Sequence, residues 1–262
     1  MTGGAEINGR RSIIIKSASD IQIMHDANQI VAGTLRMLKD TIAVGITTWD
    51  LDQLAEDFCN KRGAKPAFKG YRGFPGSLCV SINEEVVHGI PTRKKKLKRG
   101  DIISIDFGVL YKGFFGDSAV SLAVEDCSSD VMRLLNVTRE SLEEAIKQVV
   151  VGNRISDVSQ AVQECVERNG FSVVRQFVGH GIGQSLHEAP EIANFYQGER
   201  TPRLLPGMVL AIEPMVNMGT HKVKVLRDGW TVVTADKKPS AHFEHSVAVT
   251  EDGPLVLSSW GN

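Results

Sequence analysis

A repeat with an offset of 107 residues is the feature that most constrains how this chain can fold. The segment VGITTWDLDQLAEDFCNKRG at 44–63 is matched by VGNRISDVSQAVQECVERNG at 151–170, and the two share Val-Gly at the start, Gly at the end and acids such as Asp50 and Asp157. An internal repeat indicates that one structural unit is used twice. Because five identities in twenty positions are weak evidence alone, the same offset has to hold elsewhere in the chain.

The offset does hold at two acids that follow apolar runs. GDIISID ends at Asp106, and GMVLAIE ends 107 residues later at Glu213. We therefore predict two related halves, about 20–125 and 130–250, each with two helices and then a strand that begins after glycine and ends on an acid. If the halves pack about a pseudo-two-fold axis, the two acids face each other. Chance matching of common α/β patterns is the alternative, and it leaves the shared offset unexplained.

Local signals set the remaining boundaries. Residues 1–12 are polar and rich in glycine, which predicts a flexible extension before one domain at 13–262. Ser19 followed by Gln22 has the pattern of a capping box and predicts the start of the first helix. Apolar positions at helical spacing then continue this helix to about Leu38.

Composition excludes several classes of partner. The formal net charge of −1 gives no general attraction to DNA or to an anionic membrane, and no apolar run approaches the roughly 18 residues of a membrane span. The four cysteines show no CxxC spacing, which favours free thiols in a reducing compartment. We therefore expect a cytoplasmic protein.

The stretch IDFGVLYKGFFGD carries two aspartates in an apolar hairpin pattern. A tip at Lys112-Gly113 places Asp106 opposite Ala119, and Asp117, two residues from Ala119, lies on the same face. For one aspartate, exposure to solvent or a capping role is the simpler interpretation. Two buried carboxylates this close repel each other unless cations neutralise them, so the pair favours metal binding.

Three further segments supply acids and imidazoles. GHGIGQSLHEAP contains His180 and His187, AIEPM places Glu213 at the end of a strand, and HFEHSVAVT places Glu244 within an alternating strand. Taken singly, each histidine is as readily a core or surface residue, and Glu244 an exposed strand residue. Together with the two aspartates, however, these residues give four carboxylates and one imidazole, which suit two divalent ions. Oxygen-rich ligation favours manganese, iron or cobalt, and a metal pair of this kind can hydrolyse an amide.

Two other stretches have alternative interpretations. GYRGFPGSLCVSINEEVVHGIP carries Tyr71, Phe74, Cys79 and His88, which could line an apolar pocket, although core packing is the simpler interpretation for Cys79. The basic run RKKKLKR at 93–99 is typical of a solvated hairpin tip, with a ribosome or nucleic-acid contact as the less favoured alternative.

The motifs SINEEVVHGIP, GDIISIDFGVLYKGFFGD, GHGIG, LHEAP, GMVLAIEP and HFEHSVAVT together resemble the type I methionine aminopeptidases over residues 13–258. The resemblance implies the α/β (α+β) pita-bread fold, with two pseudo-symmetric halves around a central antiparallel sheet and helices outside. The spacing between Glu213 and Glu244 is too short for the helical insertion of type II members, so the chain resembles the bacterial-type enzyme.

The resemblance also implies roles for individual residues. The implied metal ligands are Asp106, Asp117, His180, Glu213 and Glu244, with Asp117 and Glu244 bridging two ions. His88 is expected to contact the scissile nitrogen, His187 the carbonyl, and Glu213 to accept a proton. The implied methionine pocket contains Tyr71, Phe74, Cys79, Leu186 and Trp230. Leu186 and Phe74 differ from the common Phe and Tyr of the family, which puts the pocket shape in question.

The expected function is removal of the initiator methionine from nascent polypeptide N-termini, with a small second residue, by a metal-bridged hydroxide that attacks the first peptide bond. A monomer is expected, with no DNA or membrane partner and a ribosome contact through 93–99 as an option. A prolidase or Xaa-Pro aminopeptidase is the nearest alternative, although about 100 residues before Asp106 is short for its extra N-terminal domain. A catalytically inactive binding module is the alternative from another class, and it would normally have lost metal ligands.

Overall fold

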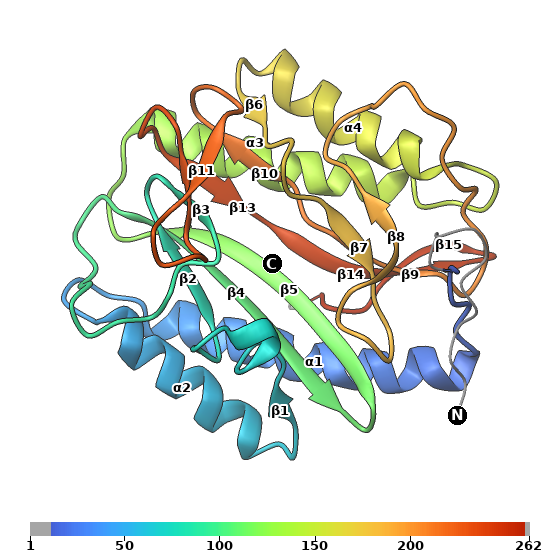
Figure 1. Cartoon of the computed structure of the whole chain (residues 1–262), viewed down its shortest axis with the longest axis horizontal. Coiled ribbons are helices and arrows are strands. Elements are labelled where there is room, and N and C mark those ends of the chain that lie inside the picture. Colours follow the sequence, from blue (N-terminus) through green and yellow to red (C-terminus); the bar gives the residue numbers. More distant parts are fainter. Residues whose placement is uncertain (1–11, 260–262) are drawn as a thin grey trace.

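The structure, a computed structural model, describes residues 12–259. The predicted extension at 1–12 therefore lies almost entirely outside the described residues. Four α-helices cover a central sheet on its outer sides (Figure 1). Their bounds are α1 Ala18–Thr41, α2 Thr48–Asn60, α3 Ser129–Lys147 and α4 Ile155–Arg168.

The strands in chain order are β1 Lys65–Pro66, β2 Cys79–Ile82, β3 Glu85–Val87, β4 Ile102–Tyr111, β5 Phe114–Ala123, β6 Ser172–Val173, β7 Gly179–Gly181, β8 Glu188–Ile192, β9 Val209–Ile212, β10 Met215–Asn217, β11 Val223–Val225, β12 Val232–Thr234, β13 Ser240–His242, β14 Glu244–Thr250 and β15 Gly253–Val256. A short 3₁₀ turn, η1, covers Tyr71–Gly73.

The main sheet has nine strands and is antiparallel throughout. Its order is β1-β4-β5-β14-β9-β7-β8, with β2 also on β4 and β15 also on β14. Two three-stranded sheets, β13-β10-β6 and β11-β12-β3, flank it. Helices α1 and α2 lie together on one side of the molecule and α3 and α4 on the other, so that β4, β5, β14 and β9 run between the helix pairs (Figure 1). This arrangement of layers is the pita-bread fold expected from the sequence.

Alternation along the strands separates a core face from a site face. In β4, the fully buried Ile103, Ile105, Phe107 and Val109 belong to the core cluster formed with α1 and α2. In β9, Leu210 and Ile212 belong to the cluster formed with α3 and α4. Because successive side chains of a strand point to opposite faces, the acids that follow these residues point away from the helices. Apolar burial against two helix pairs thus fixes the direction of the acids.

Two predictions from the sequence are wrong. Helix α1 is capped by Ser17, whose hydroxyl accepts a hydrogen bond from the backbone N–H of Asp20, and not by Ser19. The run 93–99 is not a hairpin tip but a loop that leads from β3 to β4, with Leu97 fully buried and Lys95 in an ion pair with Glu85. In both cases a residue's partner, which the sequence does not show, decides the local structure.

No helix among the described residues is long and apolar enough to cross a bilayer.

Candidate metal centre and substrate pocket

Three acids, Asp106, Asp117 and Glu244, lie on the same face of three neighbouring strands. In the β4–β5 pairing Asp106 lies opposite Ala119, as the hairpin pattern predicts, and in the β5–β14 pairing Ala119 also lies opposite Glu244. Asp117, two residues before Ala119, shares its face. The register of β5 therefore brings these three carboxylates to the same side of the sheet.

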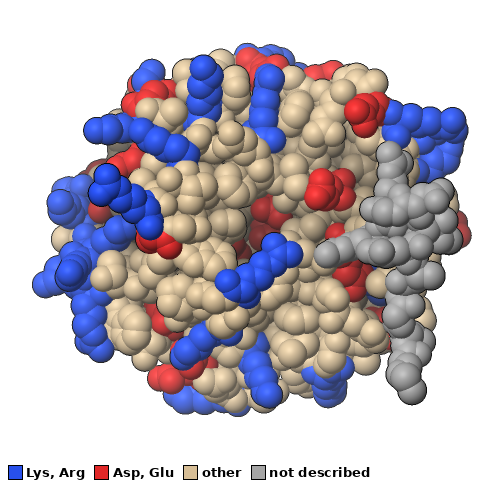
Figure 2. Space-filling view, in the orientation of Figure 1, with Lys and Arg blue, Asp and Glu red and all other residues tan. Residues whose placement is uncertain are grey.

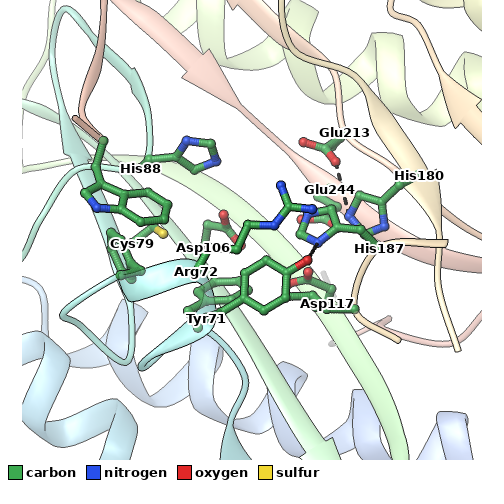
Figure 3. Close-up of a pocket in the computed structure, with 14 residues that line it drawn as sticks. Tyr71, Arg72, Cys79, His88, Asp106, Asp117, His180, His187, Glu213 and Glu244 are labelled. Atoms are coloured by element: carbon green, nitrogen blue, oxygen red, sulfur yellow. Dashed lines mark hydrogen bonds and ion pairs between the residues drawn. The ribbon is translucent and has the colours of Figure 1, made fainter. Parts of the chain in front are cut away.

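The same face of the sheet continues into strands from the second half of the chain. Ala211 of β9 pairs with Ser246 of β14 and with His180 of β7. Since Ser246 is two residues from Glu244, His180 lies on the same face as the acids, and so does Glu213, two residues beyond Ala211. The structure thus brings together all five ligands that the sequence predicts. Figure 3 shows their side chains converging from opposite ribbons.

Glycines allow His180 to sit deep in the sheet. A Cβ atom at Gly179 would lie 2.4 Å from the carbonyl oxygen of Ala211, and one at Gly181 would lie 2.2 Å from that of Ala189. No other residue fits on either side of His180, because real Cβ atoms do not approach backbone this closely. The Nδ1 atom of His180 lies 2.9 Å from the carbonyl oxygen of Gly181 and donates to it, which directs the lone pair of Nε2 towards the acids.

The carboxylates are buried without enough partners. Asp117 and Glu244 are 4% and 2% exposed, and Asp106 Oδ1, Asp117 Oδ1 and Glu244 Oε1 have no hydrogen-bond partner. Burial raises the pKa of Asp106 to about 7, and burial together with the charge of Asp106 raises the pKa of Asp117 well above its usual value. Burial followed by the neighbouring acids does the same to the pKa of Glu213 and of Glu244.

This donor set fits divalent cations. Ligand atoms of Asp117, His180 and Glu244 all lie within 4.8 Å of one another, and His180 Nε2 lies 3.6 Å from Glu213 Oε1. Burial lowers the pKa of His180 to about 4, so its imidazole is neutral and able to ligate at neutral pH. Burial alone would keep these acids protonated, whereas a cation in the same site favours their ionised form. Oxygen atoms that bind a cation need no hydrogen-bond partner, which accounts for the unpartnered oxygens. Acidic atoms form the floor of a hollow in the middle of the face shown in Figure 2.

The acids and an apolar pocket beside them line one cavity. The apolar walls include all five residues of the predicted methionine pocket, Tyr71, Phe74, Cys79, Leu186 and Trp230. The volume of the whole cavity, about 140 Å³, is small beside the roughly 300–1,000 Å³ of a site for a drug-sized ligand, so its apolar part suits a single side chain. Phe74 and Trp230 meet edge to face at 5.2 Å between ring centroids. Burial, then the charge of Asp106, raises the pKa of Cys79 well above its usual value, so this wall stays a neutral thiol.

The two remaining histidines lie at the rim of the pocket. His88 has φ of +59°, a left-handed conformation uncommon for a residue with a side chain, and its ring lies 6.4 Å from that of Trp230. His187 is exposed, stacks on Tyr71 at 5.2 Å and lies 4.2 Å from the ring of His180. The hydroxyl of Tyr71 lies 2.9 Å from His187 Nδ1. Burial lowers the pKa of His88 to about 4, so its ring is neutral at pH 7.

Three residues at the site were missed by reasoning from the sequence. Phe68 and Arg72 also line the pocket, and His242 Nε2 lies 3.8 Å from Glu213 Oε2. The glycines around Arg72 in GYRGFPG were a signal for an exposed turn near the pocket. The sequence held no such signal for Phe68, which resembles any core aromatic residue.

Comparison with known proteins agrees with this site. The profile of metallopeptidase family M24 matches residues 22–251. A fold with this sheet and a face of buried carboxylates defines a metal-dependent peptidase, and the chain belongs to metallopeptidase family M24. Within that family it belongs to the methionine aminopeptidases of bacterial type.

The relatives match over nearly their whole length. The chain is 51% identical to methionine aminopeptidase of Clostridium perfringens over 94% of this chain and 98% of the relative. It is 54% identical to methionine aminopeptidase 1 of Bacillus subtilis over 94% of this chain and 99% of the relative. The crystal structure of methionine aminopeptidase from Thermotoga maritima superposes with a TM-score of 0.93 at 46% identity, covering 95% of this chain and 100% of the other.

Proposed function

We propose that the protein is an aminopeptidase that removes the initiator methionine from nascent polypeptides, preferring a small second residue. One observation carries the proposal: a pocket with room for one side chain lies directly beside a cluster of buried, unpartnered carboxylates. The catalytic unit is inferred to be one domain at 13–262, acting as a monomer in the cytoplasm.

Five residues are proposed to hold two divalent ions, namely Asp106, Asp117, His180, Glu213 and Glu244. Asp117 and Glu244 are buried whereas Asp106 and Glu213 are half-buried, so Asp117 and Glu244 would hold the ions from the deepest part of the site. Oxygen donors outnumber nitrogen in this set and no thiolate takes part, which favours manganese, iron or cobalt. When bound, such ions act as Lewis acids and lower the pKa of water so that a nucleophile exists at neutral pH.

The protein's own residues then position the substrate and handle protons. The carboxylate of Glu213, whose Oε1 lies 3.6 Å from His180 Nε2, is proposed to accept a proton and to pass it to the departing amine. The Tyr71 hydroxyl, acting as donor to His187 Nδ1, leaves the proton of His187 on Nε2. Nε2–H can then donate to the oxygen of the scissile carbonyl as negative charge develops there. His88, whose ring is neutral at pH 7, is proposed to contact the scissile nitrogen.

The pocket accounts for the proposed choice of residue. An unbranched thioether adapts to irregular apolar walls and makes favourable contacts with aromatic rings. A chain interior cannot pass through a pocket of this size, so only a terminal residue enters it. A bulky second residue would meet the ring of His88 at the rim.

A peptide panel with defined metals tests this function. Met-Ala-Ser and an Xaa-Pro peptide are incubated with the purified protein carrying manganese, iron or cobalt, and again after exhaustive chelation. We expect cleavage of Met-Ala-Ser that is lost on chelation and restored by metal. Faster cleavage of the proline peptide would identify a prolidase-type enzyme, and activity that survives complete metal removal would exclude the metal-dependent mechanism.

A contact between the loop 93–99 and the ribosome is a separate proposal. Lys94, Lys96 and Lys98 are exposed in this loop, and such cations are attracted to RNA phosphates. Replacing these three lysines with Gln should reduce co-sedimentation with ribosomes in a salt-dependent manner. The same change at Lys237 and Lys238, on an exposed turn after β12, provides the control. Unchanged binding in the loop variant would leave these lysines as a solvated surface.

A further inference from the structure

Arg72 occupies a turn that holds it rigidly at the edge of the pocket. The backbone N–H of Gly70 donates to the carbonyl of Phe74 at 2.8 Å, and that of Phe74 donates to the carbonyl of Tyr71 at 3.0 Å. Inside this turn Arg72 has φ of +50°, a left-handed conformation uncommon for a residue other than glycine. The turn therefore fixes the direction in which the side chain leaves the backbone.

The side chain extends over the site. Its guanidinium carbon lies 5.4 Å from the ring of Tyr71, which stacks on His187, and Figure 3 shows the chain of Arg72 reaching towards His187. Arg72 is exposed, and among residues 12–259 no carboxylate lies within ion-pair distance of it. A cation with no carboxylate partner among the described residues thus stands at the mouth of the pocket.

Arg72 also borders a second depression, the outer groove, which continues from the pocket. The outer groove is lined by residues that include Arg72, His187, Pro190, Glu191, Glu199 and Arg200. It shares Arg72, His180 and His187 with the pocket, so it offers a path for the rest of a peptide whose first side chain fills the pocket.

Strand geometry indicates which substrate residue meets Arg72. In an extended peptide successive side chains point to opposite sides, so residues 1 and 3 point the same way. The first side chain points into the pocket, and Arg72 lines both this pocket and the outer groove. The third side chain therefore points to the side of the peptide on which Arg72 lies.

We propose that Arg72 is a specificity-determining residue that favours an acidic side chain at the third position of the substrate and disfavours a basic one. This proposal rests on the proposed function and deepens it, because it names a further feature of the substrates. An exposed ion pair is worth little, so the preference is modest, about two- to fivefold.

Three amidated peptides that differ at one position test the preference. They are Met-Ala-Glu-Gly-Gly, Met-Ala-Gln-Gly-Gly and Met-Ala-Lys-Gly-Gly, and kcat/KM is measured for each at low salt. For the wild type we expect Glu to exceed Gln and Gln to exceed Lys, by about two- to fivefold at each step. At about 0.5 M salt the ratios should approach one, because the charges are exposed and screened.

The variants Arg72→Asn and Arg72→Asp remove and reverse the charge with residues that tolerate a left-handed backbone. Arg72→Asn should bring the ratio of kcat/KM for the Glu peptide to that for the Lys peptide close to one, and Arg72→Asp should invert this ratio. Because each ratio is taken within one variant, any change in overall activity cancels. Lys112 offers a matched control: it also has a positive φ, of +47°, and lies 4.9 Å over the ring of Tyr111, but it is at the distant β4–β5 tip. Lys112→Asn and Lys112→Asp should keep the wild-type ratios.

The outcomes separate this inference from the proposed function. If Arg72→Asp keeps the wild-type ratios, or if the wild type itself shows none, the role of Arg72 is wrong although methionine is still released. If the wild type releases no methionine from even the Gln peptide, the proposed function itself is wrong.

Discussion

The first and second halves of the chain contain the same backbone turns at an offset of 107 residues. Glycines related by this offset have nearly equal φ angles: Gly45 and Gly152 have +94° and +95°, Gly63 and Gly170 have +72° and +77°, and Gly100 and Gly207 have +87° and +86°. A lone bridge between Thr47 and Lys96 in the first half has its counterpart between Arg154 and Arg203. Positions at this offset can therefore be compared as matched pairs in one molecule.

The halves differ in how they place their acids. In the first half, Asp106 and Asp117 lie on one hairpin whose strands are paired over ten positions with a two-residue tip. In the second half, Glu213 directly follows β9 and Glu244 begins β14; these strands are separated by the whole of β10 to β13 and pair over only four positions. One half places its acids by local chain geometry and the other by long-range pairing, yet both pairs reach the same face.

The largest effect we expect tests whether the halves contribute equally to the site. Asp106→Asn and Glu213→Gln each remove one charge at equivalent positions without changing shape. Each should lower kcat/KM for a Met-Ala peptide by roughly 10²–10³-fold or more, because each removes a stabilising group at the reacting atoms. Asp106→Ala should also abolish turnover without unfolding the chain. Circular dichroism and metal content are measured alongside the kinetics.

Glu251→Gln, an exposed acid in the turn between β14 and β15, is the control and should retain full activity. If only the second-half variant lost activity, the two acids would not be equivalent, and the assignment of Asp106 as a ligand would be refuted.

The way each half places its acids explains what could be predicted from the sequence. In the first half, the alternation of side chains along the predicted hairpin showed that Asp106 and Asp117 share a face, without knowledge of the fold. The offset gave Glu213 as the counterpart of Asp106. The pairing of Glu244 with Ala119 is a contact between residues 125 positions apart, and no local pattern encodes it. Residue type and segment therefore place Glu244 among the candidate ligands, but they do not predict this pairing.

Side-chain partners account for most of what was missed. Ser17 caps α1 because its hydroxyl reaches Asp20, while Ser19 is equally suited by type. Arg72 reaches the site because its side chain lies over the ring of Tyr71. His242 reaches it because β13 pairs with β10, in which Met215, two residues after Glu213, lies opposite His242. Such placements depend on how segments distant in sequence pack, which residue types and spacing do not specify.

The second prediction concerns the metal-free protein, in which the acids of the two halves repel each other. The native pKa values of the four acids lie above their ordinary values, that of Asp106 at about 7, so the native state binds more protons than the unfolded state between the two sets of values. The contribution of these acids to stability is therefore present at low pH and is lost as pH rises through their native pKa values.

The buried histidines change the stability in the opposite direction as pH rises, but they do so over a lower pH range. Burial lowers the native pKa of His88, His180 and His245 to about 4 from 6.5, so their contribution grows with pH and is complete above about pH 6.5. Between pH 6.5 and about 8.5 the chelated protein should therefore become less stable in urea unfolding. Asp106→Asn should flatten this dependence, and added manganese should raise stability most at the upper pH. A chelated protein that gains stability over this range would contradict the burial of the acids.

The third prediction compares Gly100 and Gly207, which share the same φ but not the same surroundings. A Cβ atom at Gly100 would lie 3.7 Å from the nearest atom, the carbonyl oxygen of Asp126, whereas at Gly207 it would lie 2.7 Å from the carbonyl oxygen of Lys16. The difference arises because residues 12–17, which precede α1, pack on the second half, where Lys16 forms a buried ion pair of 2.6 Å with Glu188.

Both changes to alanine should cost about 1–2 kcal/mol for the left-handed backbone. Gly207→Ala should cost about 1–3 kcal/mol more, because it displaces the packed segment. Urea unfolding of both variants with metal bound measures the difference. Equal losses would mean that the segment before α1 does not rest on Gly207 in solution.

The smallest effect concerns the matched N-caps of α2 and α4. The hydroxyl of Thr47 accepts a hydrogen bond from the backbone N–H of Asp50 at 3.1 Å, whereas Arg154, its counterpart at the offset, makes no side-chain cap and its guanidinium instead donates to the carbonyl of Thr201. Thr47→Ala should therefore cost about 1 kcal/mol, while Thr47→Ser should cost almost nothing. Amide hydrogen exchange should show faster exchange in the first turn of α2 in Thr47→Ala only. Because the side chain of Arg154 does not cap α4, Arg154→Ala should leave amide exchange in the first turn of α4 unchanged. An equal loss of protection in both helices would contradict the difference between these two caps.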